Sequence, residues 1–165
     1  MTHSEDVAKL NGLIKGIDIA MMTTIEPDGS LRSRPMSTQQ SELDGDLWFF
    51  SYENTAKVDE IERDRRVNLS YSSGDKNTWI SVSGTATVVN DRAKMDELWT
   101  PILKAWFPDG VEDPNLALLK VEVEQAEYWD TDSGKVVQLV GFVKALVTGN
   151  EFNPGDNVKL DLSNS

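Results

Sequence analysis

Short apolar stretches alternate with clusters of turn-forming residues along most of the chain, a pattern typical of antiparallel β proteins. In the first turn Pro27 fixes φ and Gly29 supplies a positive φ, so the apolar stretches on either side predict a hairpin. The stretch 116–129 alternates apolar with charged positions, which predicts a strand with one face in water. Six strands are expected, at 17–25, 31–38, 47–50, 67–71, 78–89 and 116–129.

Apolar residues at helical spacing predict the remaining elements. A first helix is expected over 4–16. Two more begin near Thr55 and after Asp91, and the second of them restarts at Pro101, because proline is well tolerated at a first helical position. The apolar residues of 136–147 fit a helix that packs on the barrel or on a partner, although the valines there also permit a strand.

Length and composition support one folded unit. The chain has 165 residues, of which 39% are apolar, and this is enough for one domain with a core and too little for two ordinary domains. We assign residues 1–149 to a mainly β domain, a small antiparallel barrel with peripheral helices. The stretch 150–165 is polar and contains few large apolar groups, so we expect a mobile tail there.

The charge balance limits the partners that the protein can have. Its formal net charge is −12 at pH 7, which argues against binding to nucleic acid or to an anionic membrane surface. No apolar stretch is long enough for a membrane span, and the first residues lack the pattern of a secretory signal. We therefore expect a cytoplasmic protein.

Residue usage excludes several kinds of catalytic site. The chain contains no cysteine, so it carries no disulfide, thiolate nucleophile or cysteine metal site. Its one histidine is His3, close to a terminus, so we expect neither a Ser-His-Asp triad nor a histidine metal site. Redox chemistry in this protein would have to come from a bound cofactor.

Two short basic segments stand out against the acidic background. Arg32 and Arg34 lie two residues apart on an expected strand and therefore point to the same side of the sheet. Lys57 lies in the first turn of an expected helix, where unpaired N–H groups and the helix dipole favour an anion. Together these residues predict a phosphate site. The alternatives are a solvated strand face, on which the arginines pair with Glu26 or Asp28, and an ordinary amphipathic helix around Lys57.

A set of short motifs follows one another in a characteristic order. The motifs are Met21-Met22-Thr23-Thr24, Arg32-Ser33-Arg34-Pro35-Met36, Leu47-Trp48-Phe49-Phe50-Ser51, Thr55-Ala56-Lys57, Trp79-Ile80-Ser81-Val82-Ser83-Gly84 and Glu127-Tyr128-Trp129. In this order and spacing they resemble the general stress protein 26 family, a branch of the pyridoxamine 5′-phosphate oxidase-like, FMN-binding split barrels. The resemblance extends over residues 10–148, nearly the whole chain.

The resemblance implies a six-stranded antiparallel split β-barrel that forms a homodimer with FMN at the subunit interface; FAD and riboflavin are alternative ligands. It implies that Lys57 closes on the phosphate and that Trp129 reaches the flavin from the other chain. It implies no metal site. The residues that match cofactor-binding positions are Arg32, Ser33, Arg34, Pro35, Met36, Phe49, Phe50, Ser51, Lys57, Trp79, Ser81 and Trp129.

One segment departs from the pattern of the family. In the pyridoxamine phosphate oxidases the matching tryptophan precedes an Arg-Leu-His-Asp-Arg type segment, whereas here Trp129 precedes Asp130-Thr131-Asp132-Ser133-Gly134-Lys135. Vitamin B6 oxidation is therefore not expected, and no catalytic residue is assigned. Three functions stay open: a flavin-dependent oxidoreductase of unknown substrate, a non-catalytic flavin-binding stress protein that stores, senses or scavenges, and a barrel that uses FAD or a deazaflavin.

Overall fold

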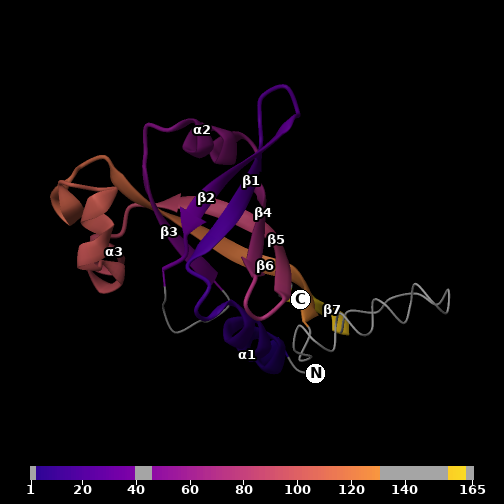
Figure 1. Ribbon diagram of the computed structural model, residues 1–165. Coiled ribbons are helices and arrows are strands. Elements are labelled where there is room, and N and C mark those ends of the chain that lie inside the picture. Colours follow the sequence, from indigo (N-terminus) through magenta and orange to yellow (C-terminus); the bar gives the residue numbers. More distant parts are fainter. Residues whose placement is uncertain (1–2, 40–45, 131–155, 163–165) are drawn as a thin grey trace, which may run out of the picture.

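The computed structural model describes residues 3–39, 46–130 and 156–162, and it shows one curved antiparallel sheet flanked by helices (Figure 1). The strands are β1 (Ile19–Ile25), β2 (Leu31–Ser37), β3 (Asp46–Tyr52), β4 (Arg66–Ser73), β5 (Thr78–Val89), β6 (Leu116–Asp130) and β7 (Asp156–Asp161). The helices are α1 (His3–Ile14), α2 (Ala56–Arg63) and α3 (Arg92–Leu98), with two 3-10 turns, η1 (Pro101–Ala105) and η2 (Gly110–Glu112). The mainly β class expected from the sequence is confirmed.

The long strand β6 organises the sheet. The strand order is β2-β1-β4-β5-β6-β3, and β7 is added beside β6. One edge of β6 pairs with β5, while the other edge pairs with β3 along its first half and with β7 along its second half. Within the described residues, β2 and β3 at the two ends of this path are linked by an isolated bridge between Gln39 and Trp48, so no full ladder closes the sheet.

The inner face of the sheet carries the main core. Met22, Leu69, Val82 and Ala126 lie in register on neighbouring strands, and all four are buried. Residues directly opposite each other on paired antiparallel strands share a face, so this row fixes which side of each strand points inward. The same register places the intervening residues on an outer face, which is described below.

Two helices close opposite ends of the inner face (Figure 1). α1 buries Leu10 and Ile14 in the main core at one end, and α2 buries Val58 and Ile61 at the other. Both pairs recur at helical spacing, so each helix presents one apolar side to the sheet. α2 is the element that matters for the site, because its Glu60 contacts Thr24 on β1 and Arg34 on β2.

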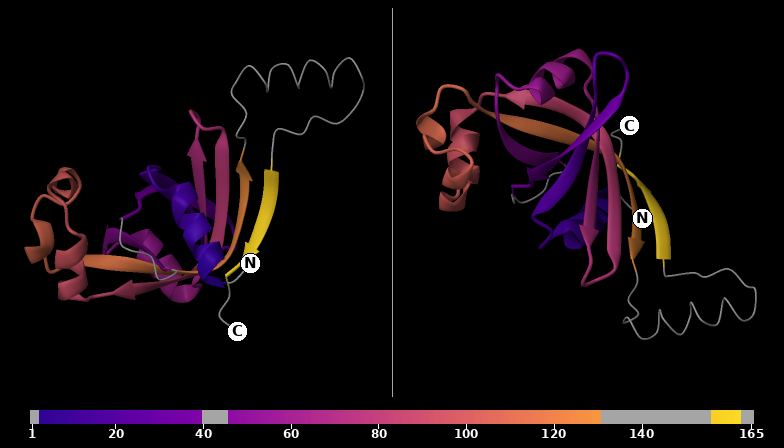
Figure 2. Two further views of the ribbon diagram at one scale, coloured as in Figure 1. Left: turned by 90° about the horizontal axis from the view of Figure 1, so that it is seen from below. Right: turned by 45° about the horizontal axis from the view of Figure 1, so that its top comes forward.

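A second, smaller core covers the outer side of β3 and the first half of β6. Phe50 and Leu118 point into it from the strands, and Met95 and Leu103 from α3 and η1. The ring of Phe50 packs edge-on against Trp99, with 5.6 Å between the ring centroids. Figure 2 shows this helical lobe at one end of β6 and β7 at the other. The expected alternation of 116–129 therefore fails at Leu118, which is buried because the lobe covers it.

The C-terminal part of the chain differs from the expectation of six strands and a mobile tail at 150–165. Within that stretch Asp156–Asp161 forms β7, a seventh strand, and Leu160 and Leu162 are buried in the main core. The second half of β6 has a strand edge with unpaired backbone groups, and β7 pairs with it while Leu160 and Leu162 pack in the core. The helix expected over 136–147 lies outside the described residues. In the described part of the chain, no helix is long and apolar enough to cross a membrane.

Candidate functional site

Arg34 occupies a nearly buried position at the end of the sheet that α2 covers. It lies opposite Met22 and therefore on the inner face, and its side chain is 15% exposed. Its Nη1 donates to Thr24 Oγ1 at 2.7 Å, and its Nη2 donates to Glu60 Oε2 at 3.0 Å. Thr24 Oγ1 in turn donates to the same Glu60 oxygen at 2.5 Å, so the three side chains form a closed ring of hydrogen bonds.

Lys57 lies beside this ring, in the first turn of α2. Burial and, next, the nearby Arg34 guanidinium hold the pKa of Lys57 below its ordinary value of 10.5, while Glu60 acts in the opposite direction. Its Nζ donates to Thr55 Oγ1 at 3.4 Å. Thr55 holds the N-cap position of α2 but makes no capping bond with its side chain, whose hydroxyl donates to the carbonyl of Tyr52 instead. Two cations thus lie close together in a partly buried place, Lys57 in the first turn of α2 and Arg34 against Glu60 further along the same helix, and an anion would stabilise this arrangement.

The other residues of the arginine strand lie in different surroundings. Arg32 shares the face of Arg34, as its spacing predicts, but its side chain is 57% exposed and lies 3.8 Å from Glu26. Arg32 therefore matches the alternative expected from the sequence, in which an arginine on a solvated strand face pairs with Glu26. Ser33 and Pro35 are exposed on the outer face, where Ser33 hydrogen-bonds Thr23, and Met36 is buried in the main core.

The residues expected from the third strand are all buried. Phe49 points into the main core and Phe50 into the second core, as alternation along a strand requires. Ser51 is 2% exposed, and its hydroxyl donates to the carbonyl of Tyr52. None of the three is on the surface of the described chain, so their contact with a cofactor stays a prediction.

The tryptophans expected at the site form a pair on the outer face. Trp79 and Trp129 lie directly opposite each other on β5 and β6, and they are 45% and 38% exposed. The next outward-facing pair along these strands is Ser81 and Glu127. Two large apolar side chains that stay this exposed mark a surface suited to a flat ring or to a second protein surface.

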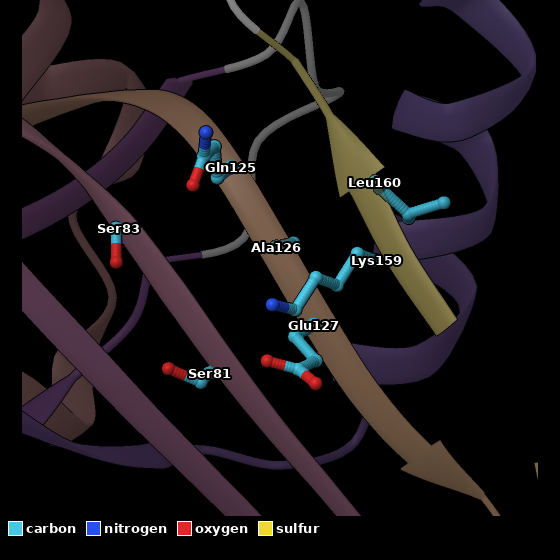
Figure 3. A pocket seen from close by; sticks show the side chains of 7 residues that line it. All are labelled: Ser81, Ser83, Gln125, Ala126, Glu127, Lys159 and Leu160. Carbon is cyan, nitrogen blue, oxygen red and sulfur yellow. The ribbon is translucent and has the colours of Figure 1, made fainter. Parts of the chain in front are cut away.

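A hollow of about 350 Å³ adjoins this pair between β5, β6 and β7. Figure 3 shows the hydroxyls of Ser81 and Ser83 on one side of it and the Lys159 amine close to the Glu127 carboxylate on the other. Asn68 on β4 donates to both serine hydroxyls, at 2.9 and 3.2 Å. The walls thus combine apolar side chains, Ala126 and Leu160, with serine hydroxyls that hydrogen bonds from β4 already orient.

The expected site residues thus separate into two groups on opposite faces of the sheet. Arg34 belongs to the inner face with Met22, whereas Trp79, Ser81 and Trp129 belong to the outer face. This follows from the strand itself, which directs successive side chains to opposite faces.

Sequence reasoning missed Glu60 and Thr24. Glu60 lies in the helix for which an ordinary amphipathic role was left open, yet it is only 4% exposed. The available signal was its spacing: Glu60 lies three residues after Lys57 and one before the buried Ile61, on the side of α2 that meets the sheet. Across the described residues, no group of histidine, cysteine, aspartate and glutamate side chains could hold a metal ion.

Comparison with known proteins finds relatives that match most of this chain. A family model described as "Pyridoxamine 5′-phosphate oxidase like" matches residues 5–153. The protein bli-3 of Neurospora crassa is 30% identical over 155 residues, which are 88% of this chain and 74% of that protein. General stress protein 26 of Bacillus subtilis is 37% identical over 73 residues, which are 42% of this chain and 51% of that protein. The crystal structure of the general stress FMN/FAD binding protein of Xanthomonas citri is 30% identical with a TM-score of 0.67, over 79% of this chain and 92% of that one.

Proposed function

We propose that this chain, which belongs to the pyridoxamine 5′-phosphate oxidase-like family and to its general stress protein 26 branch, binds FMN as a flavin-dependent oxidoreductase. The observation that carries the proposal is the pair of cations, Arg34 and Lys57, which lie close together and partly buried beside α2. A relative that is 30% identical is itself an FMN/FAD binding protein.

The cation pair suits a phosphate monoester in charge and in donors. Arg34 uses one bond from each Nη, so further guanidinium N–H groups are free of those two partners. Lys57 is a compact cation with three N–H donors, and an anion beside it would offset the burial and repulsion that lower its pKa. Hydrogen bonds from such groups to an ionised phosphate are stronger than bonds between neutral groups.

We propose that the site is shared between the two chains of a homodimer. In this arrangement Arg34 and Lys57 of one chain hold the phosphate, and the Trp79–Trp129 pair of the other covers the flavin ring. The support is the position of the two groups on opposite faces of the sheet, together with the exposure of both tryptophans. Ser81 would contribute its hydroxyl at the edge of the ring. When bound, the flavin supplies the two-electron chemistry.

Assembly can be tested with flavin-loaded protein by multi-angle light scattering. We expect a mass of about twice the 18.4 kDa of one chain. A monomer that retains flavin would exclude a shared site. A dimer in which Trp79→Asp and Trp129→Asp leave both the mass and flavin affinity unchanged would place the interface elsewhere.

Ligand identity can be tested by titrating flavin-free protein with FMN, FAD and riboflavin while tryptophan emission is recorded. We expect saturable quenching at low micromolar FMN, because a flavin ring on Trp129 accepts its excitation energy. Trp129→Phe should reduce the quenching amplitude more than Trp106→Phe does, since Trp106 lies on the helical lobe. Folded protein that shows no saturable change with any flavin would refute the proposal.

Turnover needs its own test. Loaded protein should be bleached by a nicotinamide reductant and should regain its colour in air if it is an oxidoreductase. Flavin that stays oxidised with physiological reductants would instead support storage or sensing. Pyridoxamine phosphate should not be oxidised, because the sequence after Trp129 lacks the arginines and the histidine of the oxidases.

A further inference from the structure

Glu60 is an unusual residue for a site that holds an anion. It brings a carboxylate to within 3.0 Å of Arg34, one of the two cations proposed to bind phosphate, and its side chain is only 6% exposed. Burying a carboxylate costs free energy unless it is paired and hydrogen-bonded. Its presence therefore calls for an explanation beyond helix packing, which an apolar residue would serve as well.

The geometry of Glu60 is that of a fixed counterion. Both of its hydrogen bonds end on one oxygen, Oε2, which accepts from Arg34 Nη2 and Thr24 Oγ1. Thr24 is fully buried on β1, so it holds the carboxylate from the sheet side. The ring that results holds Glu60 beside Arg34 in the ligand-free chain.

The charges in the cluster do not balance. Arg34 and Lys57 contribute two positive charges and Glu60 one negative charge, which leaves one positive charge for a ligand. A phosphate monoester such as that of FMN carries about −1.5 to −2 charges at pH 7. The linked phosphates of FAD carry one charge each, and riboflavin carries none. The carboxylate therefore repels these three ligands to different degrees.

We propose that Glu60 is a specificity-determining residue of the flavin site, a resident counterion that limits the preference for the doubly charged terminal phosphate of FMN over the singly charged phosphate groups of FAD and over riboflavin, which has no phosphate. This inference rests on the proposed function, because it assumes that Arg34 and Lys57 hold the flavin phosphate. It explains why a carboxylate is built into a cationic site: Glu60 lets Arg34 and Lys57 lie close together in the absence of ligand.

Glu60→Gln removes the charge and keeps the shape. Since both bonds end on one oxygen, the amide oxygen of glutamine can accept them in the same place. We expect FMN to bind roughly fivefold to fiftyfold more tightly, as for the loss of one close charge beside a partly buried ion pair. The gain should be smaller for FAD, and riboflavin should stay within about twofold, because the repulsion scales with ligand charge.

Glu62→Gln is the matched control. It makes the same chemical change on the same helix, two residues further on, but Glu62 is exposed. Water and salt screen a charge in that position, so the ratio of FMN to riboflavin affinity should stay within about twofold of the wild type. If the lower negative charge of the whole protein were the cause, the ratio of FMN to riboflavin affinity would change equally in Glu60→Gln and Glu62→Gln, and this result would contradict the proposal.

Glu60→Gln could weaken folding, because it leaves Arg34 and Lys57 without their counterion. The test can be repeated after one cation has been removed. The single variant Lys57→Met is then compared with the double variant that carries both Lys57→Met and Glu60→Gln. The double variant keeps the net positive charge of the original cluster, and its ratio of FMN to riboflavin affinity should exceed that of Lys57→Met by a similar factor. Calorimetry gives each affinity, and urea unfolding confirms that each variant is folded.

The outcomes separate the two proposals. A wild-type protein that binds no flavin overturns the proposed function. A wild-type protein that prefers FMN to riboflavin, but whose preference is unchanged or lowered by Glu60→Gln, overturns the counterion role and leaves Glu60 as a packing and orienting residue. The counterion role is supported if Glu60→Gln raises the ratio of FMN to riboflavin affinity both in the wild type and in Lys57→Met, while Glu62→Gln leaves this ratio unchanged.

Discussion

Lys57→Met offers the sharpest test of the phosphate site, because it should act in opposite directions on the free and the loaded protein. Without ligand, burial and Arg34 already disfavour the ammonium group, as its lowered pKa shows. Methionine has a similar length, fills the same space and carries no charge. We therefore expect the ligand-free variant to be as stable as the wild type or slightly more so.

With FMN bound, the same change should be costly. A hydrogen bond to a charged group contributes about 1.5 to 3 kcal/mol, so FMN affinity should fall about 12-fold to 150-fold. At 100 times its dissociation constant, FMN should stabilise the wild type by about 2.7 kcal/mol. A variant with a 50-fold weaker affinity would gain only about 0.7 kcal/mol at that concentration.

Urea unfolding with and without FMN measures both effects, and riboflavin serves as the ligand that lacks the phosphate. Arg65→Met is the control, because Arg65 is exposed beyond the opposite end of α2 and should change neither curve. Equal losses for FMN and riboflavin would show that Lys57 supports the ring site indirectly. A ligand-free variant much less stable than the wild type would show that the cation is structural.

Three further predictions follow from particular contacts. Gly84→Ala should destabilise the protein by about 3 kcal/mol or more in urea unfolding, since a Cβ there would lie 2.1 Å from the Glu122 carbonyl oxygen, whereas Gly74→Ala, with open space around it, should change little. The ratio of FMN to riboflavin affinity should fall as pH rises toward 10.5, because deprotonation of Lys57, whose pKa lies below that value, removes a phosphate-binding cation while the ring titrates alike in both ligands. Over the same pH range the free energy of unfolding of the ligand-free protein should rise with pH, because Lys57 holds its proton more tightly in the unfolded chain than in the folded one. Unfolding in urea at several pH values should show a smaller rise for Lys57→Met.

The strands could be predicted from the sequence because their signals are local. The Pro-Asp-Gly turn predicts its hairpin without reference to the rest of the molecule, and the alternation of 116–129 predicts a strand, although not the burial of Leu118 under the helical lobe. The start of a helix after Asp91 was likewise predicted, and the Asp91 side chain caps that helix by accepting the N–H of Lys94. The seventh strand escaped notice because its pairing partner, the second half of β6, is remote in sequence and its own residues are largely polar.

The types of residue at the candidate site could be predicted from the sequence, but the side chains that they contact could not. Spacing alone placed Arg32 and Arg34 on one face, and the structure agrees. Spacing could not say that Arg34 would be buried against Glu60 while Arg32 faces water beside Glu26. That difference depends on α2, whose Glu60 contacts Arg34 from 26 residues further along the chain.

The position of α2 also explains why this acidic protein can hold a cationic site at all. An excess of negative charge lowers the affinity for anions unless positive groups are concentrated and partly removed from water. Arg34 and Lys57 meet this condition because the helix and the sheet bury them together, and Glu60 is the group that makes their burial affordable before a ligand arrives. The same carboxylate then opposes the ligand's own charge. On this reasoning, the affinity for phosphate is set by the balance between two cations and one buried anion, and any substitution that shifts this balance should change ligand preference before it changes the fold.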